Sequence, residues 1–318
     1  MGRLRHGVAV IPVHNEARTI GAIVAGVRAY LPVIVVDDAS TDHSGRLAAA
    51  AGATVITLPK RRGKGAALRC GFAEALRRQA HVVVTLDGDG QHNPQDIPRL
   101  LEASQQAPRS IILGGRLSTG AVMPRHRLHA IRVASFWINW LGGCNIRDTQ
   151  SGFRVYPAAL LQALCLKHGG FLLESELLLK ASQAGWGIRE LSIQAVYYPG
   201  RRSQYRPVRD GTLAAAYLFY RSVRFWPSQL RRLWRGRLAD QGQTREHGWR
   251  QTYVAARATA LLPVLFLGML GQLLLRHTGC DVLAPVIRGF YDQRLLHTPS
   301  TLGKAWHDHQ QHKRWEYI

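Results

Sequence analysis

The sequence predicts an α/β fold built on a mostly parallel sheet. Short runs rich in β-branched residues alternate with longer stretches whose apolar residues recur at helical spacing, as in repeated strand–helix units. These runs are almost continuously apolar, as expected for strands buried on both faces of a parallel sheet. Several of them end abruptly in polar or acidic residues, at the place where open α/β sheets bind their ligands.

The first part of the chain is a series of such units. The turn before the second helix carries Ser40 and Thr41, and either hydroxyl is a candidate N-cap. In chain order, the predicted elements are a strand over 8–13, a helix over 17–30, a strand over 33–36, a helix over 44–51 and a short strand over 54–58.

A basic, glycine-rich loop at 60–65 opens the next predicted helix. Lysines beside glycines at a helix N-terminus favour an anion site, because free backbone amides and the positive end of the helix dipole point the same way. The spacing is not that of a P-loop. A solvated basic turn is the alternative interpretation of the same residues.

The fourth strand, predicted over 81–86, ends in two aspartates, Asp87 and Asp89, with Gly88 between them. This arrangement can present two carboxylates toward one point, which suits Mg²⁺ or Mn²⁺ held together with substrate phosphates. A simple polar turn is the alternative, since Asp and Gly are common turn residues.

The positions of other acidic residues favour the cation site over the turn. Asp37 and Asp38 follow the second strand as Asp87 and Asp89 follow the fourth. The strands of a parallel sheet share a direction, so all four carboxylates are expected at one rim of the sheet. Independent structural turns would not be expected to coincide in this way.

The chain is strongly basic. It carries 42 Lys and Arg against 20 Asp and Glu, a formal net charge of +22, of which residues 1–200 contribute +10 and residues 201–318 contribute +12. Such a surplus implies an anionic partner such as phosphorylated substrates, acidic lipid headgroups or nucleic acid. The four cysteines are far apart with no metal-ligand spacing, which favours reduced cytosolic thiols. The N-terminus shows no long apolar signal region.

Seven ordered blocks resemble family 2 glycosyltransferases, and among them most closely the dolichyl-phosphate and polyprenyl-phosphate sugar synthases. The resemblance covers about residues 7–210 and implies a Rossmann-like sheet of the nucleotide-diphospho-sugar transferase A type. The blocks are IPVHNE (11–16), VVDDASTD (35–42), RRGKGAAL (61–68), DGDGQHNP (87–94), GGR (114–116), DTQSGFR (148–154) and FLLESELLLKA (171–181).

The resemblance implies a site for a nucleotide-diphospho-sugar donor. A divalent cation, Mg²⁺ or Mn²⁺, would stabilise the charge that develops on the leaving diphosphate. The implied donor-binding residues are Pro12, Asn15 and Glu16 near the base and ribose, Asp38 on the base side, Lys64 near the charged groups, and Arg201, Arg202 and Ser203 closing the site, while Asp87, Asp89 and Gln91 would hold the cation.

The acceptor side is predicted between 116 and 154. Arginines flank a segment, 128–141, that is helical in pattern and rich in aromatic residues, so ordinary core packing and an apolar groove for a lipid tail are both open. The turn that follows offers further polar groups. The candidate acceptor contacts are Arg116, Arg132, Asp148, Ser151 and Arg154, with Asp148 as an orienting group.

Glu174 and Glu176 begin a helix that we expect to be amphipathic. Many members of the family use an acid near this point as the general base for an alcohol acceptor. A polyprenyl phosphate is already largely ionised near neutral pH and needs no base. The sequence leaves both versions open, and Glu176 is assigned to the acceptor-facing edge.

The remainder of the chain is basic and then apolar. Residues 201–250 carry 12 basic and 3 acidic residues interleaved with aromatic ones. Their long apolar stretches favour helices lying on an anionic membrane surface over a nucleic-acid interface. Residues 258–275 lack charge over 18 positions, so a single span, a re-entrant helix and a hairpin arm all remain open. The Gln-x-x-Arg-Trp pattern at 311–315 is interpreted as a coincidence.

Together these observations predict a metal-dependent, inverting glycosyltransferase that moves a sugar to a lipid carrier, with polyprenyl phosphate as the expected acceptor. Transfer to a hydroxyl of another lipid or surface glycan, and a non-catalytic polyanion-binding protein, are the alternatives. The expected regions are a catalytic domain over 1–210, interfacial helices over 211–250 and an apolar segment with a polar tail over 251–318. We expect a peripheral or single-span protein at the cytoplasmic membrane face, compatible with a homo-oligomer, and no nucleic-acid partner.

Overall fold

The computed structural model describes residues 7–117, 125–142, 144–170 and 172–194, and also 216–217 and 220–221. The chain divides into two compact units, Met1–Tyr205 and Arg206–Ile318. All the complete elements described below belong to the first unit. The predicted interfacial helices over 211–250, the apolar segment over 258–275 and the pattern at 311–315 lie outside the described residues, apart from four helical positions between 216 and 221.

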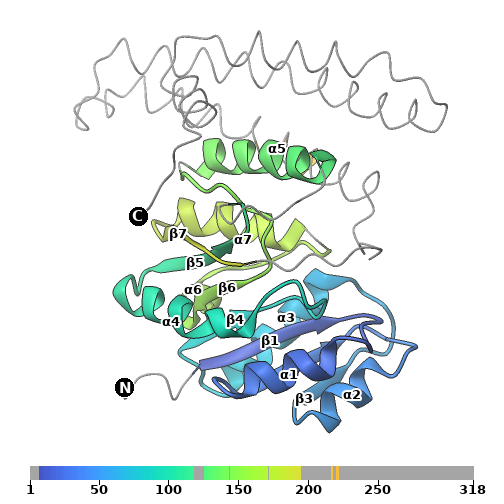
Figure 1. The fold of residues 1–318 in the computed structure, drawn as a ribbon. Coiled ribbons are helices and arrows are strands. Elements are labelled where there is room, and N and C mark those ends of the chain that lie inside the picture. The colour runs from blue at the N-terminus through green and yellow to red at the C-terminus, as the bar shows by residue number, and fades with distance from the viewer. Residues whose placement is uncertain are drawn as a thin grey trace, which may run out of the picture. The chain divides into compact units, whose positions relative to one another are not determined.

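The first unit is organised around a seven-stranded sheet with the strand order β3-β2-β1-β4-β6-β5-β7 (Figure 1). Every neighbouring pair is parallel except the two pairs that β6 makes with β4 and β5. The strands are β1 (Gly7–Val13), β2 (Val33–Asp37), β3 (Thr54–Thr57), β4 (Val82–Thr85), β5 (Ser110–Gly115), β6 (Arg154–Pro157) and β7 (Gly187–Ser192).

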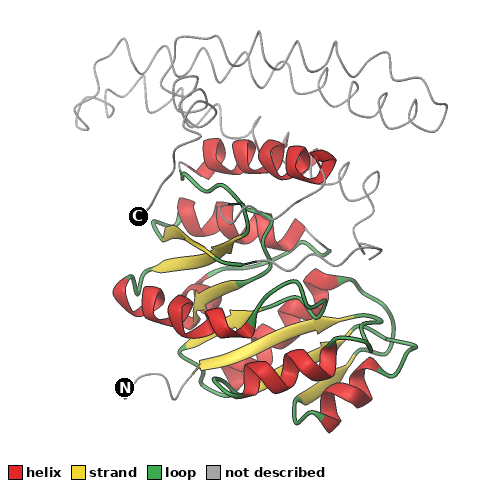
Figure 2. Cartoon of the chain, viewed as in Figure 1, coloured by secondary structure: helices red, strands yellow, loops and turns green. Residues whose placement is uncertain are grey.

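Helices cover both faces of this sheet (Figure 2). Helices α1, α2 and α4 pack on one face, α3, α6 and α7 pack on the other, and α5 packs against α7. The bounds are α1 (Ile20–Arg28), α2 (Ser44–Ala50), α3 (Lys64–Arg77), α4 (Ile97–Gln106), α5 (Arg125–Gly142), α6 (Ala158–Ala163) and α7 (Leu172–Gln183), and a 3₁₀ turn, η2 (Pro94–Asp96), precedes α4.

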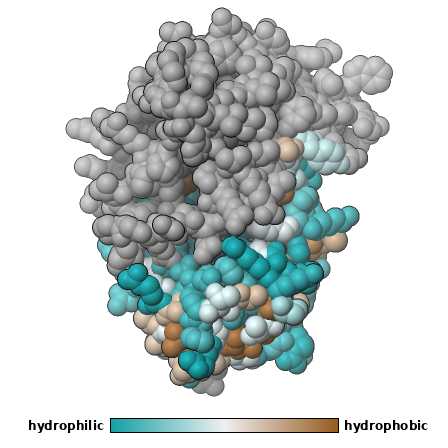
Figure 3. All heavy atoms as spheres, turned by 90° about the vertical axis from the view of Figure 1, so that its right-hand side faces the viewer, coloured by the Kyte–Doolittle hydropathy of each residue, from teal (hydrophilic) through white to brown (hydrophobic). Residues whose placement is uncertain are grey.

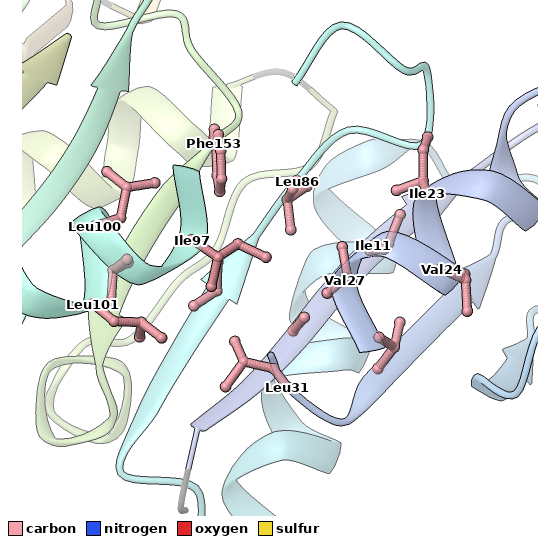
Figure 4. Packing of buried hydrophobic residues seen from close by; sticks show 14 of the residues in the cluster. Ile11, Ile23, Val24, Val27, Leu31, Leu86, Ile97, Leu100, Leu101 and Phe153 are labelled. Carbon is pink, nitrogen blue, oxygen red and sulfur yellow. The ribbon is translucent and has the colours of Figure 1, made fainter. Parts of the chain in front are cut away.

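The core on the α1 and α4 side is continuous across five strands, β2, β1, β4, β6 and β5. Ile11 of β1 and Leu86 after β4 meet Ile23 of α1 and Ile97 of α4, while Phe153 extends the cluster toward β6 (Figure 4). Burying such a side chain contributes about 1.5–3 kcal/mol. This packing fixes the positions of the strand ends, and the loops of the site follow directly after them.

The predicted Rossmann-like, mostly parallel sheet is confirmed for the described residues, and each strand and helix predicted over the first 86 residues is present. The predicted cap of α2 is wrong. The N-cap position is His43, in a left-handed conformation at φ 68°. Ser40 and Thr41 instead bond to Asn15, which secures the preceding loop.

Helix α7 also differs from its prediction, because it is buried nearly all round and is not amphipathic. It lies between the sheet and α5, so its apolar and acidic residues alike are enclosed.

On one side of the molecule, hydrophilic side chains cover most of the described surface, and apolar ones form small separate patches (Figure 3).

Candidate active site

The site is built at the carboxyl ends of the adjacent strands β2, β1 and β4. The loops that follow these strands are tied to each other. Asp38 donates its backbone N–H to the carbonyl of Val13 at 2.8 Å, and the Thr19 hydroxyl donates to the carbonyl of Gly88 at 2.7 Å. The predicted gathering of strand-end residues at one rim is therefore what the fold produces.

The loop after β1 is locked onto the loop after β2. Asn15, at φ 57°, accepts the N–H of Thr41 through its side-chain oxygen at 2.8 Å and donates its own N–H to Ser40 at 3.0 Å. The Glu16 N–H donates to the Ser44 hydroxyl at 2.7 Å. These contacts fix the shape of a partly exposed corner in which Pro12 is half-buried within β1.

Asp38 holds the basic glycine-rich loop. Its buried carboxylate accepts the backbone N–H groups of Arg62 at 2.6 Å and Gly63 at 2.7 Å. Gly63 lies at φ +86°, and α3 begins at the next residue, Lys64. The aspartate therefore sets where α3 starts, and its predicted contact with a nucleotide base stays a prediction.

Lys64 joins this loop to the acidic turn after β4. Its ammonium lies 2.6 Å from an oxygen of Asp87 and 3.1 Å from an oxygen of Glu174, and all three side chains are at most 24% exposed. Burial alone would lower the pKa of Lys64, but the attraction of the two carboxylates outweighs burial and raises that pKa. Burial alone would raise the pKa of Asp87, and the positive charge of Lys64 lowers it instead.

The acidic turn is shaped by its own side chains. Asp89 accepts the N–H of Gln91 at 3.0 Å, and the Asp87 N–H points at Nδ1 of His92 at 3.5 Å. The buried His92 ring packs against Phe153 with 5.3 Å between centroids, and burial lowers its pKa. Its Nε2 atom has no hydrogen-bond partner among the described residues. The His92 ring thus connects the turn to Phe153.

Gly152 gives Asp87 its space. A Cβ atom at position 152 would lie 2.5 Å and 2.7 Å from the two carboxylate oxygens of Asp87, closer than real Cβ contacts. The Thr85 hydroxyl donates to the carbonyl of Gly152 at 2.9 Å and fixes the distance between the two chains. The turn that leads into β6 therefore forms one wall of the acidic site.

The donor atoms at this turn fit a hard divalent cation that completes its coordination with phosphate oxygens. Asp87 and Asp89 would supply carboxylate oxygens and Gln91 an amide oxygen, and Mg²⁺ typically uses only one or two carboxylates beside substrate phosphates. The ammonium on Asp87 shows that this carboxylate already attracts a cation. Within the described ranges, no three His, Cys, Asp or Glu side chains form a ready-made metal centre.

The predicted acceptor residues Arg116 and Asp148 lie together in the interior. They form a bidentate ion pair, in which Nε and Nη2 of Arg116 donate to the two carboxylate oxygens of Asp148 at 2.7 Å and 3.0 Å. Arg116 is 4% exposed and Asp148 is fully buried. Burial would raise the pKa of Asp148, and the guanidinium lowers it. Glu190 of β7 accepts the N–H groups of Arg147 and Asp148 and holds this turn in place, as no sequence pattern had indicated.

Arg154 and Ser151 have contacts within the protein. The fully buried guanidinium of Arg154 donates to the carbonyl oxygens of Ser151, Thr149 and Glu174 at 2.6, 2.8 and 3.1 Å. The Ser151 hydroxyl accepts the N–H of Phe153 at 3.4 Å. Arg154 thereby joins the 149–151 turn to the start of α7, and its predicted phosphate contact stays a prediction.

Glu176 lies away from the acidic turn and holds a different loop. Its fully buried carboxylate pairs with Lys180 at 2.7 Å and accepts the N–H groups of His168 at 2.9 Å and Lys167 at 3.2 Å. Burial would raise its pKa, but these contacts lower it to about 2. The carboxylate of α7 that reaches the Lys64–Asp87 pair is Glu174, which the sequence-based site assignment missed.

The structure does not describe the side chains of the remaining predicted site residues. Arg132 belongs to α5, but its side chain lies outside the described part of the structure, as do Arg201, Arg202 and Ser203. In the portion that is described, no helix has the length and apolar character needed to cross a bilayer.

Known proteins resemble the chain in both sequence and fold. The family model described as "Glycosyl transferase family 2" matches residues 8–163. An undecaprenyl-phosphate mannosyltransferase of Micrococcus luteus is 30% identical over 203 residues, which cover 59% of this chain and 83% of that protein. A polyprenol monophosphomannose synthase of Mycolicibacterium smegmatis is 30% identical over 201 residues, covering 58% and 76%.

A solved structure shares the fold. Glucosyl-3-phosphoglycerate synthase from Mycobacterium tuberculosis, solved in complex with Mn²⁺, uridine diphosphate and phosphoglyceric acid, has a TM-score of 0.53 at 21% identity. The match covers 66% of this chain and 75% of that chain. At this level of identity the likeness concerns the arrangement of the sheet and its helices.

Proposed function

Because the chain belongs to glycosyl transferase family 2, we propose that it transfers a sugar from a nucleotide-diphosphate donor to polyprenyl phosphate with the help of Mg²⁺ or Mn²⁺. The observation that carries the proposal is the Lys64–Asp87 ion pair at the rim of β1, β2 and β4, with Asp89 in the same turn as Asp87. Open α/β sheets bind ligands at that rim. Of the relatives at 30% identity, one is named an undecaprenyl-phosphate mannosyltransferase and another a polyprenol monophosphomannose synthase.

The donor would lie across the loops after β1 and β2. Pro12, Asn15 and Glu16 form the fixed corner for the base and ribose, and Asp38 lies beside it. Lys64 stands at the first position of α3, where the positive end of the helix dipole also favours a diphosphate. Arg201, Arg202 and Ser203 remain our candidates for covering the donor.

The cation would be held by Asp87, Asp89 and Gln91, and it supplies positive charge to the diphosphate as the glycosidic bond breaks. The chain's own contribution is to keep that charge in place. Gly152 leaves room for the Asp87 carboxylate, and His92 supports the turn from beneath. Lys64, which lies beside Asp87, would offer a second positive charge to the donor phosphates.

The acceptor phosphate needs no base, because it is largely ionised near neutral pH. This agrees with Glu176, whose pKa of about 2 and three hydrogen-bonding or ionic partners make it a poor proton acceptor. Arg116, Arg132 and the 148–154 turn are our candidates for the acceptor side. We place the reaction at the cytoplasmic membrane face, in keeping with the lipid acceptor and the net charge of +22.

The test is a donor and acceptor screen with the full chain in detergent and Mn²⁺. A panel of nucleotide-diphospho-sugars that includes GDP-mannose is offered with undecaprenyl phosphate or with undecaprenol, and the lipid product is identified by mass spectrometry. We expect a sugar phospholipid with one donor, only from the phosphorylated lipid, and none in EDTA. No transfer from any donor would contradict the proposal, and efficient transfer to undecaprenol would replace it with a hydroxyl acceptor.

A further inference from the structure

Lys64 is shared between two carboxylates that belong to different elements. Asp87 follows β4 and is part of the proposed cation site, whereas Glu174 lies in the first turn of α7. The ammonium is closer to Asp87, at 2.6 Å, than to Glu174, at 3.1 Å. The ammonium therefore bridges the acidic turn and α7.

A divalent cation at the proposed site and this ammonium would share one carboxylate, that of Asp87. The ammonium already lies at contact distance from one oxygen of this carboxylate. A metal ion bound to either oxygen, at about 2 Å, would therefore stand close to the ammonium. Like charges at such separations in a half-buried site repel strongly, because little water screens them. One of the two must therefore move when both are present.

The backbone on either side of Lys64 is fixed, so only its side chain can make this move. Asp38 binds the N–H groups of the two residues before Lys64. At Gly65, a Cβ atom would lie 2.6 Å from the carbonyl oxygen of Gly170, so the start of α3 packs directly against another loop. The flexible four-carbon stem of lysine allows the ammonium to swing while α3 stays in place.

Glu174 is fixed as well. The buried guanidinium of Arg154 donates to its backbone carbonyl at 3.1 Å, and its own side chain is 8% exposed. The Glu174 carboxylate therefore stays in place when the ammonium leaves Asp87, and it remains available as the second partner of the ammonium. A buried lysine that left Asp87 without such a partner would be costly.

We propose that Lys64 is a displaceable counter-ion: it neutralises Asp87 before the divalent cation binds, and then moves to Glu174 and the donor diphosphate. Glu174 is in this account a positioning residue, since it acts through Lys64. The inference rests on the proposed function, because it takes Asp87 as a cation ligand. The consequence is that the cation and the donor diphosphate act together to displace the ammonium from Asp87.

The test measures Mn²⁺ binding to the full chain by titration calorimetry, with and without UDP or GDP. Without nucleotide, Lys64→Met should bind Mn²⁺ about tenfold more tightly than wild type, because the competent state of Asp87 is no longer depleted. With a nucleoside diphosphate present, Lys64→Met should bind Mn²⁺ more weakly than wild type, because the variant has no ammonium to stabilise the bound diphosphate. Glu174→Gln should bind Mn²⁺ more weakly than wild type in the absence of nucleotide.

Two controls separate displacement from a general effect of charge. The double variant Lys64→Met with Glu174→Gln leaves the net charge unchanged and should still bind Mn²⁺ more tightly than wild type. Lys60→Ala removes an exposed charge of the same loop and should leave Mn²⁺ affinity within about twofold, because exposed charges are screened. Circular dichroism and thermal unfolding confirm that each variant is folded.

The outcomes distinguish this inference from the function on which it rests. Wild type that binds no Mn²⁺, with or without nucleotide, contradicts the proposed function. If wild type binds Mn²⁺ but the single or double Lys64 variant binds it no more tightly without nucleotide, the counter-ion role is wrong. Unchanged affinity in Glu174→Gln removes Glu174 from the account.

Discussion

At the scale of single residues, the space around Asp87 matters as much as its charge. Gly152 faces both of its carboxylate oxygens, and Lys64 holds one of them. A carboxylate can serve a cation only if it is held in one orientation, and the groups around a metal ligand typically change metal affinity 10- to 100-fold. The turn before β6 is therefore part of the proposed cation site although it supplies no ligand.

Gly152→Ala should lower Mn²⁺ affinity by about tenfold or more while the protein still folds. The added methyl group would lie 2.5 Å from Asp87 and force that side chain aside. Calorimetric titration with Mn²⁺ measures the loss. Gly21→Ala is the matched control, since a Cβ atom within α1 at this position meets nothing within 4 Å. Equal Mn²⁺ affinity in the two variants would contradict the role given to Gly152.

At the scale of elements, Glu176 connects α7 to the loop over 165–170. Its carboxylate accepts two N–H groups of that loop, and the loop packs against the start of α3 at Gly65. Lys180, one turn further along α7, completes the contact at 2.7 Å. A buried acid of α7 thus positions the loop beside Lys64 without reaching the reacting groups.

This contact predicts a specific pH dependence of stability. The pKa of Glu176 is about 2 in the folded protein against an ordinary 4.5, so the unfolded chain binds a proton that the folded chain does not between these values. The free energy of unfolding should therefore fall as the pH drops from about 4.5 toward 2. Urea unfolding at several pH values measures this slope.

Glu176→Gln should be less stable than wild type at pH 7 and should lose its share of the slope below pH 4.5. Glu102→Gln, at an exposed position of α4, is the control and should keep the wild-type slope. A slope in Glu176→Gln equal to that of wild type would show that the carboxylate titrates normally in the folded protein.

Glu174 and Glu176 of α7 show how much of the site could be predicted from the sequence. Asp87 and Lys64 were found because strand ends and helix starts have recognisable patterns, and parallel strands bring them to one rim. Glu174 and Glu176 lie two positions apart on α7, and only the packing of that helix decides which one reaches Lys64. An amphipathic pattern could not decide it, because α7 is enclosed on nearly all sides.

At the scale of the whole molecule, a three-layer unit places a basic, glycine-rich loop and an acidic turn at one rim of its sheet (Figure 1). The parallel strands were predictable from apolar runs that alternate with helices. The antiparallel strand β6 was not, because its direction depends on pairing with both β4 and β5, residues far from it in the sequence. That strand matters, since it brings Gly152 and Arg154 beside Asp87 and α7.

The central claim is that the acidic turn holds the cation on which sugar transfer depends. Its most direct test compares the single-turnover rate of sugar transfer to undecaprenyl phosphate in wild type and Asp89→Asn, each with Mn²⁺ and with EDTA. We expect Asp89→Asn to lose about a thousandfold or more in rate with an unchanged melting temperature, because a bound metal supplies several kcal/mol of charge stabilisation. Transfer by Asp89→Asn at the wild-type rate, or by wild type undiminished in EDTA, would contradict the claim.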